Sequence, residues 1–126
     1  MNHHQFCPND WELWMKKMFL DPISTLLDET QFRLDLFETT NDIIVEVCTE
    51  TFHIKEIWIK CEKDRLYIKM DPGSDQERAR SVQFPFDLSN HLITAKYEQD
   101  WLEIFIDKNP SNESICNEIK IRRNPR

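Results

Sequence analysis

Glycine is nearly absent from this sequence, because Gly73 is the only glycine among 126 residues. A phosphate-cradling loop and a dinucleotide-binding fingerprint each need several glycines at fixed spacing. Kinase-like and Rossmann-type nucleotide functions are therefore excluded. The turns of the chain must depend on Asn, Asp, Ser and Pro, which favour tight backbone conformations by other means.

Long apolar runs and paired cysteines are also missing. No stretch approaches the roughly 18 apolar residues that span a bilayer, and the first residues lack the charged and apolar regions of a signal peptide. Cys7, Cys48, Cys61 and Cys116 form no Cys-x-x-Cys pair, which is typical of free thiols in a reducing compartment. We expect a cytoplasmic protein without a membrane span; a spore-associated location is the alternative.

Catalytic and metal-binding motifs are not recognisable either. His53 and His91 stand apart from any Ser or Cys nucleophile motif, so neither is expected to act as a general base. His3, His4 and Cys7 lie close together, but no fourth ligand for a tetrahedral site is evident. We expect no enzymatic activity, no cofactor and no bound metal.

Charge is distributed unevenly along the chain. Residues 1–107 contain 11 Lys and Arg against 21 Asp and Glu, whereas residues 108–126 contain 5 against 2. An acidic body argues against nucleic acid as a partner, because phosphate binding depends on clustered Lys and Arg. The basic tail should be attracted to the acidic body of its own chain or of a neighbour.

Residues 1–30 are expected to form an N-terminal arm with a short amphipathic helix. Its apolar residues recur with the spacing of one helix face and are Trp11, Trp14, Met15, Met18 and Phe19. Asn9 or Asp10 is placed to cap this helix, and Pro22 follows its end. The apolar stripe is a candidate surface for partners or other subunits; packing on its own domain is the alternative.

From Gln31 onward the apolar residues alternate with period two, which is typical of strands. The predicted strands are 31–38, 42–48, 56–62, 65–70, 81–88, 92–98 and 101–107. Turn-forming residues separate these runs. Residues 31–107 therefore predict one all-β domain, an immunoglobulin-like antiparallel sandwich whose two sheets bury alternate faces.

The tail, residues 108–126, carries Ile119 and Ile121 on either side of Lys120. Extended backbone points residues i and i+2 to the same side, so the two isoleucines form one apolar pair. A polar segment with such a pair predicts a strand-like element that docks into an apolar groove.

These features together resemble the α-crystallin domain of small heat-shock proteins over roughly residues 31–121. The resemblance depends on "NDIIVEV", "HIKEIWIKCEKDRLYIKM", "FPFDL", "ITAKYEQDWLEIFI" and the Ile-x-Ile tail. Ala95 and Leu102 match the family's Ala-x-x-x-x-Gly-Val-Leu turn, in which Asp100 and Trp101 replace Gly and Val. Asp can adopt the left-handed conformation that this turn requires.

The resemblance also implies where the tail binds. In the family the Ile-x-Ile motif lies in a groove between two edge strands, usually on another subunit. The corresponding groove positions are Ile57, Ile59, Ile93, Ala95 and Tyr97. Docking of the two isoleucines on their own domain is the alternative. The loop at 71–80 is shorter than the strand-exchange loop of bacterial members, and Phe84 stands where the family often has Arg, so the mode of dimerisation is left open.

The family's activity is ATP-independent holding of unfolding proteins. The expected partners are unfolding client proteins and further copies of this chain, in a dimer or a larger homo-oligomer. The helix stripe and the outward aromatics Trp58, Tyr67, Trp101 and Phe105 are candidate client or oligomer contacts. A structural or assembly protein of the spore-coat type and a CS-domain-like co-chaperone are the alternatives.

Overall fold

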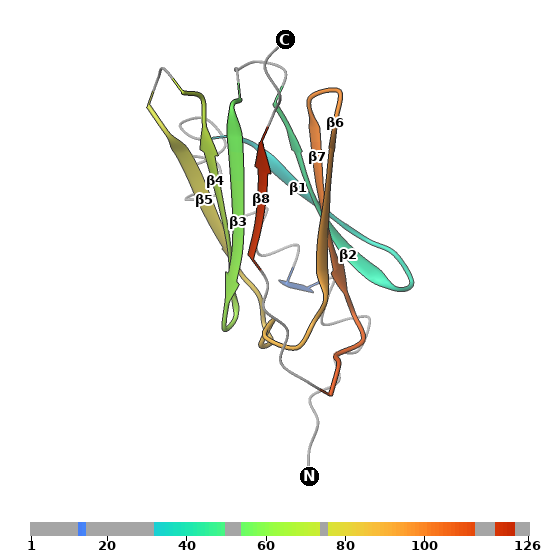
Figure 1. Cartoon of the computed structure of the whole chain (residues 1–126). Helices are drawn as coiled ribbons and strands as arrows, with labels where there is room; N and C mark the ends of the chain where they lie inside the picture. Colours follow the sequence, from blue (N-terminus) through green and yellow to red (C-terminus); the bar gives the residue numbers. More distant parts are fainter. Residues whose placement is uncertain (1–12, 15–31, 50–53, 74–75, 113–117, 123–126) are drawn as a thin grey trace.

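The computed structural model describes residues 13–14, 32–49, 54–73, 76–112 and 118–122. Its strands are β1 (Leu34–Glu38), β2 (Asp42–Cys48), β3 (Glu56–Glu62), β4 (Arg65–Asp71), β5 (Arg78–Gln83), β6 (Ile93–Glu98), β7 (Trp101–Asp107) and β8 (Glu118–Arg122). They form two antiparallel sheets of four strands (Figure 1). Sheet A has the order β1-β2-β7-β6, and sheet B has the order β5-β4-β3-β8.

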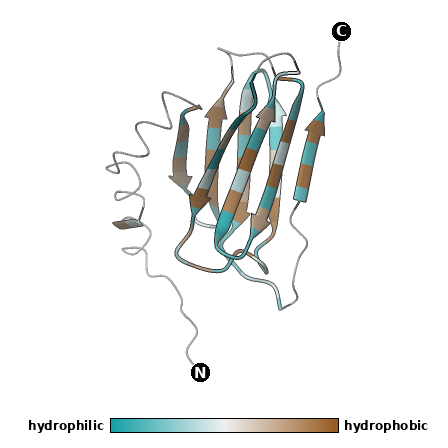
Figure 2. Ribbon diagram, turned by 90° about the vertical axis from the view of Figure 1, so that its left-hand side faces the viewer, coloured by the Kyte–Doolittle hydropathy of each residue, from teal (hydrophilic) through white to brown (hydrophobic). Residues whose placement is uncertain are grey.

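The two sheets bury their facing sides against each other. Inward positions alternate with outward ones along each strand, which appears as brown and teal bands in Figure 2. The buried core includes Ile43, Val45, Val47, Ile57, Ile59, Leu66, Ile68, Met70, Leu102, Ile104 and Ile106. These residues belong to the faces that the sequence pattern predicts. For the part of the chain that the structure describes, the prediction of an all-β domain built from two antiparallel sheets is therefore confirmed.

Strand bounds agree with the sequence pattern to within one residue except at β1, which begins at Leu34 instead of residue 31, and at β5. β2, β3 and β7 have the predicted limits, but β5 covers Arg78–Gln83 instead of 81–88. Pro85 cannot donate to a ladder, and the segment after β5 bonds instead to the β3–β4 turn, where the Phe84 amide donates to the Asp64 carbonyl. The pattern also missed that Arg80 occupies a buried inward position and donates from Nη1 to the Phe32 carbonyl at 3.0 Å.

The turn between β6 and β7 consists of two residues, Gln99 and Asp100, with φ of 49° and 68°. Positive φ at both positions is the geometry of a tight hairpin turn that matches the twist of its strands. Asp100 thus adopts the left-handed conformation expected where the resembled family has Gly. The Asp100 carbonyl accepts a hydrogen bond from the Thr49 amide, which ties this turn to the end of β2.

Little of the N-terminal arm belongs to the described residues. Of the predicted helix only Leu13 and Trp14 are described, and the rest lies outside, so the helix stays a prediction. This short segment lies on the opposite side of the sandwich from β8 (Figure 2). Within the described ranges, no helix is long and apolar enough to cross a membrane.

Candidate functional site

The tail contributes a strand, β8, to the free edge of β3. β8 runs antiparallel beside β3 (Figure 1). In the strand register Ile121 lies opposite Ile57, and Ile119 lies opposite Ile59. It is therefore the edge strand of sheet B, and it also contacts β6 across the opening of the sandwich. The structure thus brings the two tail isoleucines together with the predicted groove, and it does so within one chain.

Burial of β8 alternates as expected for a strand with one apolar side. Ile119 and Ile121 are half-buried and pack against the core, whereas Glu118, Lys120 and Arg122 are exposed. On β3, by contrast, Ile57 and Ile59 are fully buried. The tail isoleucines therefore lie at the edge of the core, beside β3 side chains that are fully buried when β8 is in place.

The other wall of the groove comes from β6. Ile93 is buried, while Ala95 and Tyr97 are half-buried and pack against the core. The Tyr97 hydroxyl and Thr49 Oγ1 lie 3.0 Å apart, and Thr49 Oγ1 donates to the Asp100 carbonyl at 3.0 Å. These contacts fix the ring of Tyr97. Thr49 was not singled out from the sequence, because nothing in the alternating pattern indicates its partner 48 positions away.

Polar contacts above the isoleucine pair also join the tail to β3. Trp58 Nε1 donates to Glu118 Oε2 at 2.7 Å, and Arg122 forms an ion pair with Glu56 at 3.2 Å. All four side chains lie on the solvent side of sheet B. Each contact therefore adds modestly to docking and is weakened by salt.

The connection from β7 to the tail is anchored at the base of the sandwich. The Ser111 amide donates to the Asn90 carbonyl at 2.7 Å, and Asn90 Nδ2 donates back to the Ser111 carbonyl at 3.2 Å. His91 Nδ1 lies 2.7 Å from the Asp107 carbonyl. Lys108 contacts Glu38 Oε2 at 2.6 Å. The tail is thus held to its own domain as far as Ser111, which limits how far β8 can reach from there.

Cys61 continues the inward row of β3 beyond the tail. It faces the core together with Ile57 and Ile59 and is half-buried. Burial raises the pKa of the Cys61 thiol to about 12, because a thiolate is poorly solvated there. Cys61 is therefore held as the neutral thiol and packs against the core; Cys48 and Cys61 are both free thiols.

The predicted partner surface is only partly described. The Trp14 ring lies 4.8 Å from that of Phe84, and its Nε1 donates to the Gln83 carbonyl at 3.1 Å, so Trp14 packs on its own domain. The other four members of the stripe, Trp11, Met15, Met18 and Phe19, lie outside the described residues. Their role stays a prediction.

The outward aromatics are unequally exposed. Trp101 is 46% exposed, while Trp58, Tyr67 and Phe105 are half-buried on the outer faces. Phe37 on β1, 47% exposed, belongs to the same outward phase and was missed by the sequence analysis.

The edge of β3 is occupied by an extended segment of the same chain. Among the described residues, no group of three or more His, Cys, Asp or Glu side chains could hold a metal ion. An apolar row beside a strand edge can bind an extended chain by adding a strand to the sheet. No family model and no curated protein matches this chain.

Proposed function

We propose that this protein is an ATP-independent holdase with an α-crystallin-type, immunoglobulin-like sandwich. The observation that carries the proposal is β8, whose Ile119 and Ile121 lie opposite Ile59 and Ile57 on β3. In this proposal the tail is a removable cover. Unfolding proteins bind the apolar edge that the tail leaves when it detaches.

The energetics suit a reversible cover. A fully buried isoleucine contributes about 1.5–3 kcal/mol, and the two tail residues are only half-buried. Ordering each tail residue costs about 1–2 kcal/mol, which offsets the gain from the two isoleucines and from the backbone pairing with β3, so the net free energy that holds β8 in place is small. Detachment exposes apolar side chains and unpaired backbone groups of β3, which match the exposed segments of an unfolding protein.

The test is suppression of aggregation without nucleotide. A heat-labile client is warmed with the purified protein, and light scattering is followed with and without ATP. We expect the protein to lower scattering equally in both conditions. The variant Ile119→Ala with Ile121→Ala should protect at a lower molar ratio, because its groove is uncovered, while Lys120→Ala on the exposed side of β8 should behave like the unmodified protein. If neither the unmodified protein nor the variant Ile119→Ala with Ile121→Ala lowers the light scattering of the client, the proposal is wrong.

We further propose that the tail can dock on a neighbouring chain and so build an oligomer. The same β8–β3 register would then form between two copies. Light scattering coupled to gel filtration should show smaller species for Ile119→Ala with Ile121→Ala than for Lys120→Ala. If the two variants have the same mass, the tail does not join neighbouring chains and docks only on its own domain.

A structural or assembly protein is the second candidate, and the exposed aromatics Phe37 and Trp101 on the outside of sheet A favour it. Such a protein would assemble without protecting clients. A CS-domain-like co-chaperone would instead bind an ATP-dependent chaperone as a monomer and would be unaffected by the tail substitutions. The same two measurements separate the three functions.

A further inference from the structure

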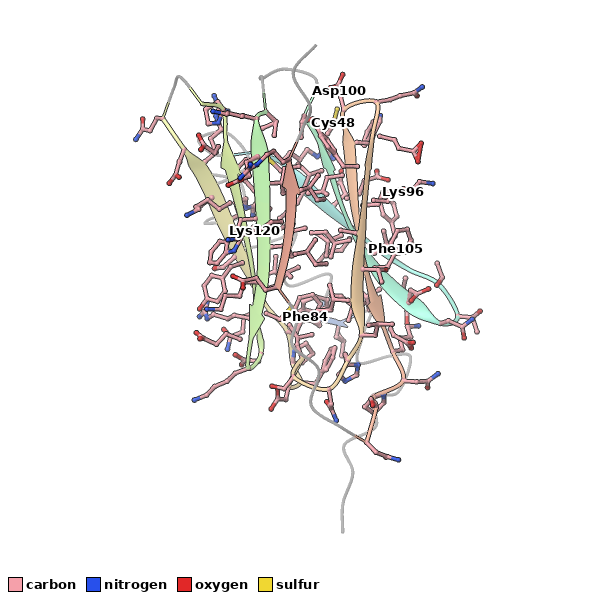
Figure 3. The ribbon with its side chains drawn as sticks, viewed as in Figure 1. Cys48, Phe84, Lys96, Asp100, Phe105 and Lys120 are labelled. Carbon is pink, nitrogen blue, oxygen red and sulfur yellow. The ribbon has the colours of Figure 1, made fainter. Side chains whose placement is uncertain are left out.

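The outer face of sheet A carries side chains aligned in rows by the strand register. One row is apolar and runs from Phe37 through Ile44 to Phe105. The next outward row is acidic and consists of Asp35, Glu46 and Glu103, with Lys96 at its end on β6. Figure 3 shows Phe105 and Lys96 on the side of the molecule away from sheet B.

Carboxylates stand opposite one another in the acidic row. The pKa of Glu46 is raised first by its partial burial and then by Glu103 and Asp35 on the neighbouring strands. In the described part of the chain, neither Glu46 nor Glu103 forms an ion pair, whereas Asp35 pairs with Arg33 at 3.3 Å and Lys96 with Glu98 on its own strand at 3.2 Å. Like charges placed opposite each other on a sheet are destabilising. A cationic partner on this face would relieve that repulsion.

The outer face of sheet B has the complementary character. Trp58 lies between Lys69 on β4 and Lys120 on β8 in the strand register. The Lys69 and Lys60 ammonium groups lie 4.9 Å and 5.9 Å from the centre of the Trp58 ring. Tyr67 stands opposite Lys60 in the next row. The centre of this face therefore presents Lys60 and Lys69 around two aromatic rings. Their ammonium groups also lie 4.0 Å from Glu62 and 3.9 Å from Glu77, in exposed ion pairs that a partner's carboxylates can replace.

We propose that the outer face of sheet A of one copy packs on the outer face of sheet B of a second copy. The acidic row then meets the lysines, and the apolar row meets Trp58 and Tyr67. A contact between two sheet A faces is disfavoured because it would bring the acidic rows together. Since each copy offers both faces, the contact is heterologous and builds an open stack unless its rotation closes a ring.

The size of the faces sets the strength of this contact. Four strands of about six residues cover roughly 20 Å in each direction. Such a face buries roughly 400–500 Å² per copy, below the about 800 Å² per partner of stable complexes. The association should therefore be weak, concentration-dependent and sensitive to salt. It is independent of the tail groove and of the holdase proposal.

Sedimentation velocity of the full chain tests the proposal. Association is expected at about 20 mM salt, where the Debye length is about 20 Å, and should be lost at about 500 mM, where it is about 4 Å. The variant Glu46→Lys with Glu103→Lys reverses the charge on the outer face of sheet A. The variant Lys60→Glu with Lys69→Glu reverses the charge on the outer face of sheet B. Each variant alone should associate at least about tenfold more weakly, and an equimolar mixture should associate again, because opposite charges meet once more.

The controls separate this contact from docking by the tail. Circular dichroism and thermal unfolding should show that both charge-reversal variants remain folded, since the changed side chains lie on outer faces. The variant Ile119→Ala with Ile121→Ala should keep the salt-sensitive association. A protein that stays monomeric at about 20 mM salt, or an equimolar mixture that fails to associate, would overturn the proposal.

Discussion

β3 has a neighbour on each side, and the two neighbours differ in how they are attached. β4 follows β3 through a two-residue turn at Lys63 and Asp64 and buries its inward side chains completely. β8 arrives from the far end of the chain and only half-buries Ile119 and Ile121. The same strand therefore has one partner whose inward side chains are fully buried and one partner whose inward side chains are half-buried, and in the proposed function the second partner can leave. The proposed function depends on this difference.

Truncating the β4 side should have the largest effect. Ile68 is fully buried opposite Ile59, so Ile68→Ala leaves a cavity in the core and should lower the free energy of unfolding by about 2–5 kcal/mol. Urea denaturation measures this change. Lys69→Ala on the outer side of the same strand is the matched control and should stay within about 0.5 kcal/mol. A loss of less than about 1 kcal/mol for Ile68→Ala would mean that β4 is no more essential than β8.

The equivalent change on the β8 side should act locally. Ile119→Ala with Ile121→Ala removes two half-buried side chains and should cost about 1–2 kcal/mol, without unfolding the sandwich. Hydrogen exchange should become faster in the peptide covering β3, whose edge β8 protects, and stay unchanged in β5 and β7. Equal acceleration in all strands would show that the tail belongs to the permanent core.

The next effect is on the rate at which the Cys61 thiol is alkylated. With its pKa raised to about 12, the thiol should be alkylated roughly a thousandfold more slowly at pH 9 than the same residue in urea. Because the folded state holds this proton more tightly, stability should fall as the pH rises from about 9 toward 12. Peptide mapping after alkylation reports the rate for each cysteine.

A comparison of two variants sharpens the test on Cys61. Cys61 lies opposite Leu66 on β4, one position beyond the last β3 residue that pairs with β8. Its shielding should therefore survive Ile119→Ala with Ile121→Ala but be lost in Ile68→Ala. Fast alkylation in the tail variant would assign the shielding to β8 instead.

The sequence predicts the strands of the sandwich better than it predicts where the tail docks. Alternation predicts β2, β3 and β7 to the residue, because each inward position must be apolar. It fails at β5, where Arg80 interrupts the apolar row and Pro85 ends the ladder. Spacing also predicts the Ile119–Ile121 pair as a strand. Spacing cannot predict whether this strand pairs with its own chain or with another copy, because no feature of the tail sequence itself distinguishes the two.

The polar contacts of the tail show the same limit. Glu118 meets Trp58 only because β8 pairs with β3 in one particular register, which joins residues 60 positions apart. No motif in either segment predicts that meeting. The same holds for Thr49 and Tyr97 at the end of the groove. Such contacts depend on the assembled sheets and are found only in the structure.

The smallest expected effect lies at the contact between Glu118 and Trp58. The indole N–H donates to an exposed carboxylate at 2.7 Å, so solvent competes and the pair should contribute about 0.5 kcal/mol. A double-mutant cycle isolates it, with Glu118→Ala and Trp58→Phe, which keeps an aromatic ring but removes the donor. Glu118→Gln should retain most of the coupling, because the amide oxygen still accepts. A coupling energy near zero in urea denaturation would show that β8 is held by its two isoleucines alone.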